Sequence, residues 1–208
     1  MNEYIRENTL FPLTERDIEV FSKAVSHPHD ECLTHHAIKD KSILRTDFTK
    51  NMIRLAKMLD LKVSSVTAFT GKPGETSKIH IDGEPNTTYS WRLAYYPKGD
   101  NSTLNWWEYG PVLYHRVLEL DNSREKDNET PTGYSVIDSD QKLYTQHMDD
   151  IKSAFVRTDV PHSVDMTKAT EERLTISATF FPHISWEELN ARLDGLENGN
   201  KKIQYIAS

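Results

Sequence analysis

Hydrophobic and polar positions alternate in short runs from Val63 onward, and clusters of turn residues separate these runs. Short β-branched and aromatic runs of this kind are typical of antiparallel sandwiches and jelly rolls. The pattern predicts eight strands, over Val63–Phe69, Lys78–Asp82, Tyr89–Tyr96, Thr103–Tyr109, Val112–Glu119, Tyr134–Ile137, Ala154–Asp159 and Arg173–Phe180. We therefore expect a two-sheet barrel at the centre of the protein.

Near both ends of the chain, apolar residues recur three and four positions apart, which is the spacing of an amphipathic helix. The pattern predicts one helix over Leu13–Val25, with Thr14 as its N-cap, and a second over Asp47–Leu59. A third helix begins at Ser185, where a capping box closes with Glu188. We expect these helices to cover the barrel.

The length of 208 residues favours one domain, because single cores commonly contain one to two hundred residues. The expected fold class is mainly β with flanking helices. Within it we expect buttressing helices over 1–62, the β core over 63–182, and a helix and tail over 183–208. The polar run at 121–130 is expected to be a solvated loop, with an active-site lid as the alternative.

Charge and cysteine content narrow the choice of partners and compartment. Lys and Arg number 25 against 32 Asp and Glu, giving a net charge of −7, and no long basic stretch is present to bind nucleic acid. Cys32 is the only cysteine, so an intrachain disulfide and a four-cysteine zinc site are excluded. With no secretory signal or bilayer-length apolar stretch, we expect a cytoplasmic protein that binds no membrane. Its oligomeric state is open.

The candidate chemistry begins at the end of the second predicted strand, in His80-Ile81-Asp82. Residues two apart on a strand point to the same face, so His80 and Asp82 can share one ligand. An imidazole and a carboxylate suit Fe(II) when a second imidazole joins them, and His162 is the best candidate. Alone, a His-x-Asp-Gly sequence also arises wherever a strand ends in an Asp-Gly turn.

The last predicted strand adds a second polar feature. Arg173, Thr175, Ser177 and Thr179 alternate with apolar residues and therefore share one face. An arginine beside a hydroxyl can bind a carboxylate through two guanidinium hydrogen bonds and one from the hydroxyl.

His80-x-Asp82, the distal His162 and Arg173-x-Thr175, in this order on a predicted jelly roll, resemble the Fe(II)- and 2-oxoglutarate-dependent dioxygenase superfamily. The resemblance covers about Val63 to Pro182. It implies a double-stranded β-helix, which is a jelly roll with a cupin-like barrel.

The resemblance also implies roles for these residues. His80, Asp82 and His162 would be the catalytic metal ligands for Fe(II), and Arg173 would bind the distal carboxylate of the cosubstrate 2-oxoglutarate. Thr175 stands where the family has serine, and it retains a hydroxyl. The activity implied is hydroxylation of a C–H bond by O₂ with release of succinate and CO₂, because halogenating members replace the acid found here as Asp82. A small metabolite, an amino acid or a protein side chain is the expected substrate.

Several further polar and aromatic residues are candidates for substrate binding at the barrel mouth. They are Arg92, Tyr95, Asn105 and Trp107. The alternative is that the aromatic residues fill the space between the sheets. His27, His29, His35 and His36 match no metal-binding spacing and are expected in an exposed loop.

Two other functions remain open from the sequence. One is a cupin-type oxygenase without a cosubstrate, although the usual clustered cupin motif is absent. The other is a jelly-roll module without a metal, in which the polar face from Arg173 to Thr179 binds a carboxylated ligand.

Overall fold

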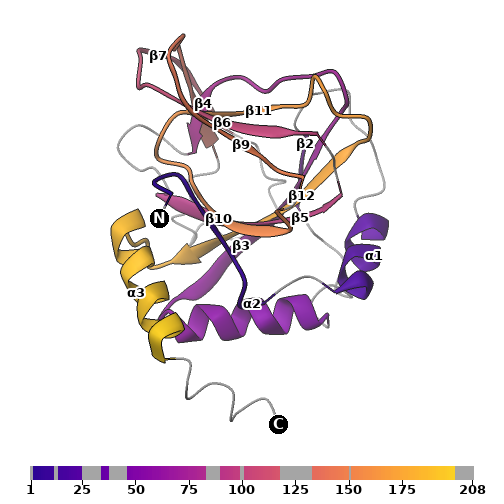
Figure 1. Cartoon of the computed structure of the whole chain (residues 1–208), viewed down its shortest axis with the longest axis vertical. Coiled ribbons are helices and arrows are strands. Elements are labelled where there is room, and N and C mark those ends of the chain that lie inside the picture. Colours follow the sequence, from indigo (N-terminus) through magenta and orange to yellow (C-terminus); the bar gives the residue numbers. More distant parts are fainter. Residues whose placement is uncertain are drawn as a thin grey trace.

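Two six-stranded antiparallel sheets form the centre of the computed structural model, with helices on one side (Figure 1). The structure describes residues 2–11, 14–24, 34–37, 46–82, 90–98, 101–117, 133–149 and 151–199. The predicted class, mainly β with flanking helices, is confirmed.

We call the helix-covered sheet sheet A and the other sheet B. Sheet A has the order β1 (Ile5–Glu7), β10 (Ser153–Arg157), β5 (Trp91–Lys98), β12 (Arg173–Phe181), β3 (Lys62–Gly71) and β2 (Thr34–Ala37). Sheet B has the order β7 (Val112–Val117), β8 (Gly133–Ile137), β4 (His80–Asp82), β11 (His162–Asp165), β6 (Thr103–Trp107) and β9 (Lys142–His147).

The chain passes back and forth between the sheets. From β3 to β6 it alternates between sheet A and sheet B, stays in sheet B through β9, and alternates again from β9 to β12. This alternation is the connectivity of a double-stranded β-helix, as predicted. Each sheet keeps two edge strands, so the two sheets form an open sandwich.

The helices cover the outer face of sheet A, as the lower part of Figure 1 shows. They are α1 (Glu15–Ala24), α2 (Asp47–Met58) and α3 (Trp186–Gly199). Leu55 of α2 and Leu189 of α3 are fully buried in one cluster with Ile176 of β12. Apolar burial of this kind is the main force that holds the helices on the sheet.

Local capping explains where the helices begin. The Thr14 hydroxyl accepts a hydrogen bond from the Asp17 amide (3.2 Å), and the Asp17 carboxylate accepts one from the Thr14 amide (3.0 Å), which confirms the predicted cap of α1. The Ser185 hydroxyl accepts from the Glu188 amide (3.1 Å), as predicted for α3. Thr46 caps α2 in the same way.

All eight predicted strands are present in the described residues, but four others were missed. These are β1, β2, β9 and β11, of three to six residues each. Such short segments contain too few alternating positions to be distinguished from loops. His35 and His36, expected in a loop, lie on β2, which pairs with β3; His27, His29 and the 121–130 run lie outside the described residues.

The space between the sheets is divided into an apolar and a polar half. Ala94 and Tyr96 of β5 pack against Leu104 and Trp106 of sheet B in a second core. Toward β12 and β3 the inner face of sheet A is polar, and Ser65 there forms a hydrogen bond with Thr179 (2.6 Å). A polar interior next to an apolar core is the arrangement of a ligand site.

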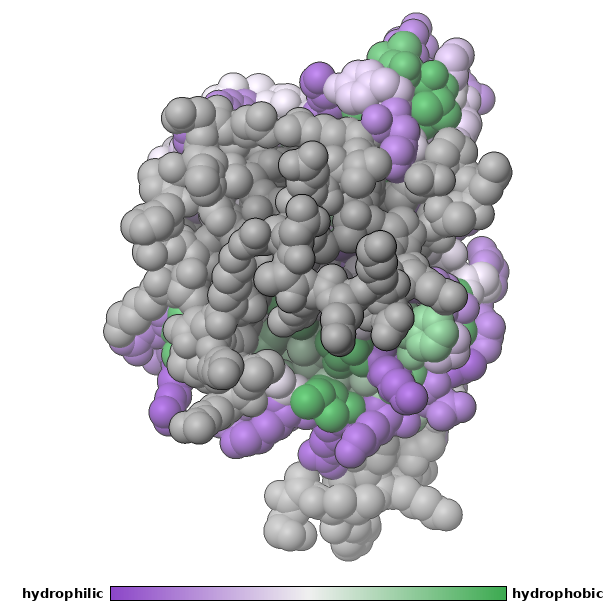
Figure 2. Space-filling view, turned by 180° about the vertical axis from the view of Figure 1, so that it is seen from behind, coloured by the Kyte–Doolittle hydropathy of each residue, from purple (hydrophilic) through white to green (hydrophobic). Residues whose placement is uncertain are grey.

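The β7–β8 pair projects from the sandwich and carries exposed apolar residues. Val112 is 41% and Leu113 58% exposed, and Figure 2 shows hydrophobic side chains at this projecting end. Among the described residues, no helix is both long and apolar enough to cross a membrane.

Replacing the fully buried Leu55 by alanine tests the packing of α2. We expect Leu55→Ala to lower the free energy of unfolding by about 2–5 kcal/mol, because it leaves a cavity beneath sheet A. Urea denaturation followed by circular dichroism measures this loss. Ile53→Ala on the same helix is the control, since Ile53 is 44% exposed and its loss should cost less than about 0.5 kcal/mol. Equal losses would contradict the packing.

Candidate metal centre

Three ligand-type side chains from two neighbouring strands converge on the inner face of sheet B. His80 and Asp82 lie two apart on β4, and His162 on β11 is the register partner of His80. One ligand atom from each residue lies within 4.8 Å of those of the other two. The structure therefore brings together the three residues that the sequence selected.

Backbone carbonyls fix the orientation of both imidazoles. Nδ1 of His80 lies 2.8 Å from the carbonyl oxygen of Lys78, and Nδ1 of His162 lies 3.0 Å from that of Val160. A carbonyl only accepts hydrogen bonds, so each Nδ1 carries the proton and donates. The lone pair is then on Nε2 of each ring, which is the form that binds a metal.

Arg92 on β5 of sheet A reaches across the interior to Asp82. Its Nε donates a hydrogen bond to Oδ2 of the carboxylate, and the two side chains are 16% and 13% exposed. This contact orients the carboxylate and leaves Oδ1 for another ligand. Arg92, which the sequence analysis expects to bind substrate, instead contacts a candidate metal ligand.

The surroundings keep the acid ionised and the buried histidine neutral. Burial raises the pKa of the Asp82 carboxyl, but the charges of Arg92, His162 and His80 together with the Arg92 hydrogen bond outweigh this effect, so the pKa lies below its usual value. Burial, aided by the charge of His80, lowers the pKa of His162 to about 4. A carboxylate and a neutral imidazole are the forms that ligate metals.

A buried arginine lies on the inner face of sheet A. Arg173 is 4% exposed, its Nε donates to Oγ1 of Thr175 (3.1 Å), and its guanidinium carbon lies 5.0 Å from the ring centre of Tyr96. Its Nη1 is buried without a hydrogen-bond partner. An unsatisfied buried donor on a charged group is costly in a folded protein, and a bound anion would remove that cost.

The expectation that Tyr95 on β5 binds substrate is wrong. Tyr95 lies on the helix-covered face, 1% exposed, where its ring contacts Phe48 of α2 in an edge-to-face arrangement. Tyr96 faces the interior beside Arg173, and burial raises its pKa to about 12. Residues 92 and 95 are an odd number of positions apart, so strand alternation already places them on opposite faces. That rule, applied from Arg92, would have selected Tyr96.

Asn105 and Trp107 also lie away from the site, on the outer face of sheet B. Asn105 accepts a hydrogen bond from Thr145 (2.7 Å), and Trp107 donates one to Ser163 (2.9 Å). Trp106 between them faces the interior and is fully buried. The expectation that Asn105 and Trp107 line the mouth is therefore wrong, and the packing alternative holds for Trp106.

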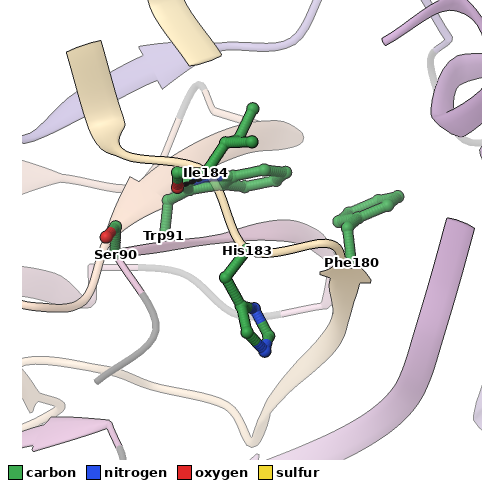
Figure 3. A pocket seen from close by; sticks show the side chains of 5 residues that line it. All are labelled: Ser90, Trp91, Phe180, His183 and Ile184. Carbon is green, nitrogen blue, oxygen red and sulfur yellow. Dashed lines mark hydrogen bonds between the residues drawn. The ribbon is translucent and has the colours of Figure 1, made fainter. Parts of the chain in front are cut away.

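A small pocket elsewhere is unrelated to these residues. Figure 3 shows the side chains that line it, which are Ser90, Trp91, Phe180, His183 and Ile184. Its water-accessible volume is about 10 Å³, which admits one water molecule. Trp91 and Phe180 belong to the helix-covered core, so this pocket does not reach the space between the sheets.

No protein-family model matches the sequence, and no curated protein matches it. Solved structures resemble the fold. EvdO2 from Micromonospora carbonacea var. aurantiaca, complexed with 2-oxoglutarate, has a TM-score of 0.45 at 14% identity, over 80% of this chain and 82% of that one. AviO1 from Streptomyces viridochromogenes Tue57 has a TM-score of 0.43 at 11% identity, over 85% and 89%.

HygX from Streptomyces hygroscopicus, with nickel and 2-oxoglutarate bound, has a TM-score of 0.44 at 11% identity, over 85% of this chain and 81% of that one. The low sequence identities and TM-scores show only a distant similarity to these three structures. The assignment of the fold rests on the strand connectivity of this chain.

Removing the arginine of the Arg92–Asp82 pair tests its energetic role in the metal-free protein. We expect Arg92→Met to lower the free energy of unfolding by roughly 1–3 kcal/mol, because Asp82 becomes a largely buried charge without this partner. Adding Asp82→Asn should recover much of the loss. Urea denaturation of the four proteins gives the coupling energy.

The control for this cycle is an exposed ion pair on α2. Lys50 and Asp47 are 68% and 67% exposed, so Lys50→Met should leave the free energy of unfolding nearly unchanged. Additive effects of Arg92→Met and Asp82→Asn would show that the two side chains do not depend on each other.

Proposed function

We propose that this protein is an Fe(II)- and 2-oxoglutarate-dependent oxygenase that hydroxylates a C–H bond. The observation that carries the proposal is the placement of two polar groups in one interior. His80, Asp82 and His162 converge on sheet B, while Arg173 on sheet A has a buried donor without a partner.

The donor set fits a divalent metal of the iron type. Two imidazole Nε2 atoms and one carboxylate oxygen form the two-histidine, one-carboxylate set that non-haem Fe(II) oxygenases use. His80, Asp82 and His162 would hold the metal, and three protein ligands would leave room for an oxo acid to bind beside them. When bound, the iron supplies the activation of O₂.

The position of Arg173 fits the far end of a dicarboxylic oxo acid. Arg92, which contacts Asp82, and Tyr96, which contacts Arg173, lie four residues apart on the same face of β5. They are therefore about 13 Å apart along the strand. Both ends of an elongated diacid could thus be held, one by the metal and the other by Arg173 and Thr175.

The proposed reaction consumes one molecule each of substrate, 2-oxoglutarate and O₂. Substrate C–H, 2-oxoglutarate and O₂ give substrate C–OH, succinate and CO₂, with one oxygen atom in the alcohol and the other in succinate. Arg173 and Thr175 bind the cosubstrate, and Arg92 holds Asp82 in orientation. The substrate is a small metabolite, an amino acid or a protein side chain.

A spectroscopic titration separates this function from the alternatives. Adding Fe(II) and 2-oxoglutarate without oxygen should produce a weak visible charge-transfer band, and admitting O₂ should yield succinate. A metal-free binding module or an oxygenase without a cosubstrate would give neither the band nor succinate.

Replacing Asp82 tests the metal site. We expect Asp82→Ala to abolish iron-dependent formation of succinate, because the only carboxylate of the ligand set is lost. The fold should persist, as judged by circular dichroism. Asn105→Ala, on the outer face of sheet B, is the control and should retain turnover. Undiminished succinate formation by Asp82→Ala would refute the proposal.

Replacing Arg173 tests the cosubstrate site separately. Arg173→Ala should raise the KM for 2-oxoglutarate by about 100-fold, which corresponds to the loss of charge-assisted hydrogen bonds worth roughly 3 kcal/mol. The affinity for the metal, measured by titration with Fe(II) under anaerobic conditions, should change far less. An equal loss of both would indicate that Arg173 has a structural role.

A further inference from the structure

Ser177 is a second buried polar group on the inner face of sheet A without a hydrogen-bond partner. It is 3% exposed, and its Oγ is unsatisfied, as is Nη1 of Arg173 four residues earlier on the same strand. Two other hydroxyls on this face of β12 have partners, since Thr179 pairs with Ser65 and Thr175 accepts from Arg173.

The register of the strands places Ser177 between the two ends of the candidate site. Its partner on β5 is Ala94, which lies midway between Arg92 and Tyr96 on the same face. Arg92 contacts Asp82 at one end, and Tyr96 contacts Arg173 at the other. A molecule that extends from Arg173 to the metal ligands must therefore pass Ser177.

We infer that the Ser177 hydroxyl donates a hydrogen bond to an oxygen of the carboxylate that Arg173 binds in the oxo acid, since the methylene groups between that carboxylate and the metal offer no acceptor. This inference rests on the proposed function. A buried hydroxyl without a partner costs stability in the free protein, and a ligand oxygen removes that cost only in the complex. Ser177 is thus a binding residue whose contribution is absent until the ligand is present.

This role has a signature that a structural serine lacks. In Ser177→Ala, no hydrogen bond of the free protein is lost, so the melting temperature without ligand should be unchanged or higher. The affinity of the Ni(II)-loaded protein for 2-oxoglutarate, measured by isothermal titration calorimetry, should fall about tenfold, the effect of one hydrogen bond to a charged ligand. Ni(II) accepts the same nitrogen and oxygen ligands and keeps turnover out of the measurement.

Ser153→Ala is the matched control. Ser153 is 2% exposed, lies on β10 of the same sheet, and its hydroxyl accepts a hydrogen bond from Asn8 (2.9 Å) on the helix-covered side. Its replacement should lower the melting temperature and leave the affinity for 2-oxoglutarate unchanged. The two serines should therefore show opposite patterns.

Two results would overturn the inference while the proposed function stands. One is an unchanged affinity for 2-oxoglutarate in Ser177→Ala when the wild-type protein binds it. The other is a loss of melting temperature as large as that of Ser153→Ala, which would make the hydroxyl structural. If the Ni(II)-loaded wild-type protein binds no 2-oxoglutarate, the proposed function fails and the inference fails with it.

Discussion

The antiparallel pairing of β4 with β11 is the contact on which the candidate site depends. It sets His80 opposite His162 and, with the two-residue period of β4, directs both rings and the Asp82 carboxylate to the same interior. A shift of one residue in this register would turn His162 to the outer face. The neighbouring strands β8 and β6 flank the pair on both sides and hold it within sheet B.

The residues that stabilise the fold and those that form the candidate site lie in different parts of the sandwich. The helix-covered face of sheet A and the inner half near Trp106 bury apolar side chains, which stabilise the fold. The other inner half contains the ion pair of Arg92 with Asp82 and the unsatisfied donor of Arg173, which are costly to bury. Apolar burial elsewhere offsets that cost, so polar groups can stay in place for a ligand.

Much of the fold and part of the site could be predicted from local pattern. Alternation gave the long strands, and capping signals gave the helix starts at Thr14 and Ser185. The same rule distinguishes Tyr95 from Tyr96. Tyr95 lies an odd number of positions from Arg92 and faces the helices, whereas Tyr96 lies an even number away and faces the interior. The short β11 could not be recognised, because four residues after a proline contain too little periodicity.

The sequence by itself determined which residue types are available and which of them share a face of one strand, because side-chain direction along a strand has a fixed period of two. His80 with Asp82, and Arg173 with Thr175 and Ser177, follow from that rule. Only the tertiary structure decided which face is the interior, which strands are neighbours, and that Arg92 contacts Asp82 rather than a substrate. Those outcomes depend on the packing of two sheets and on contacts between distant segments, which no local pattern encodes.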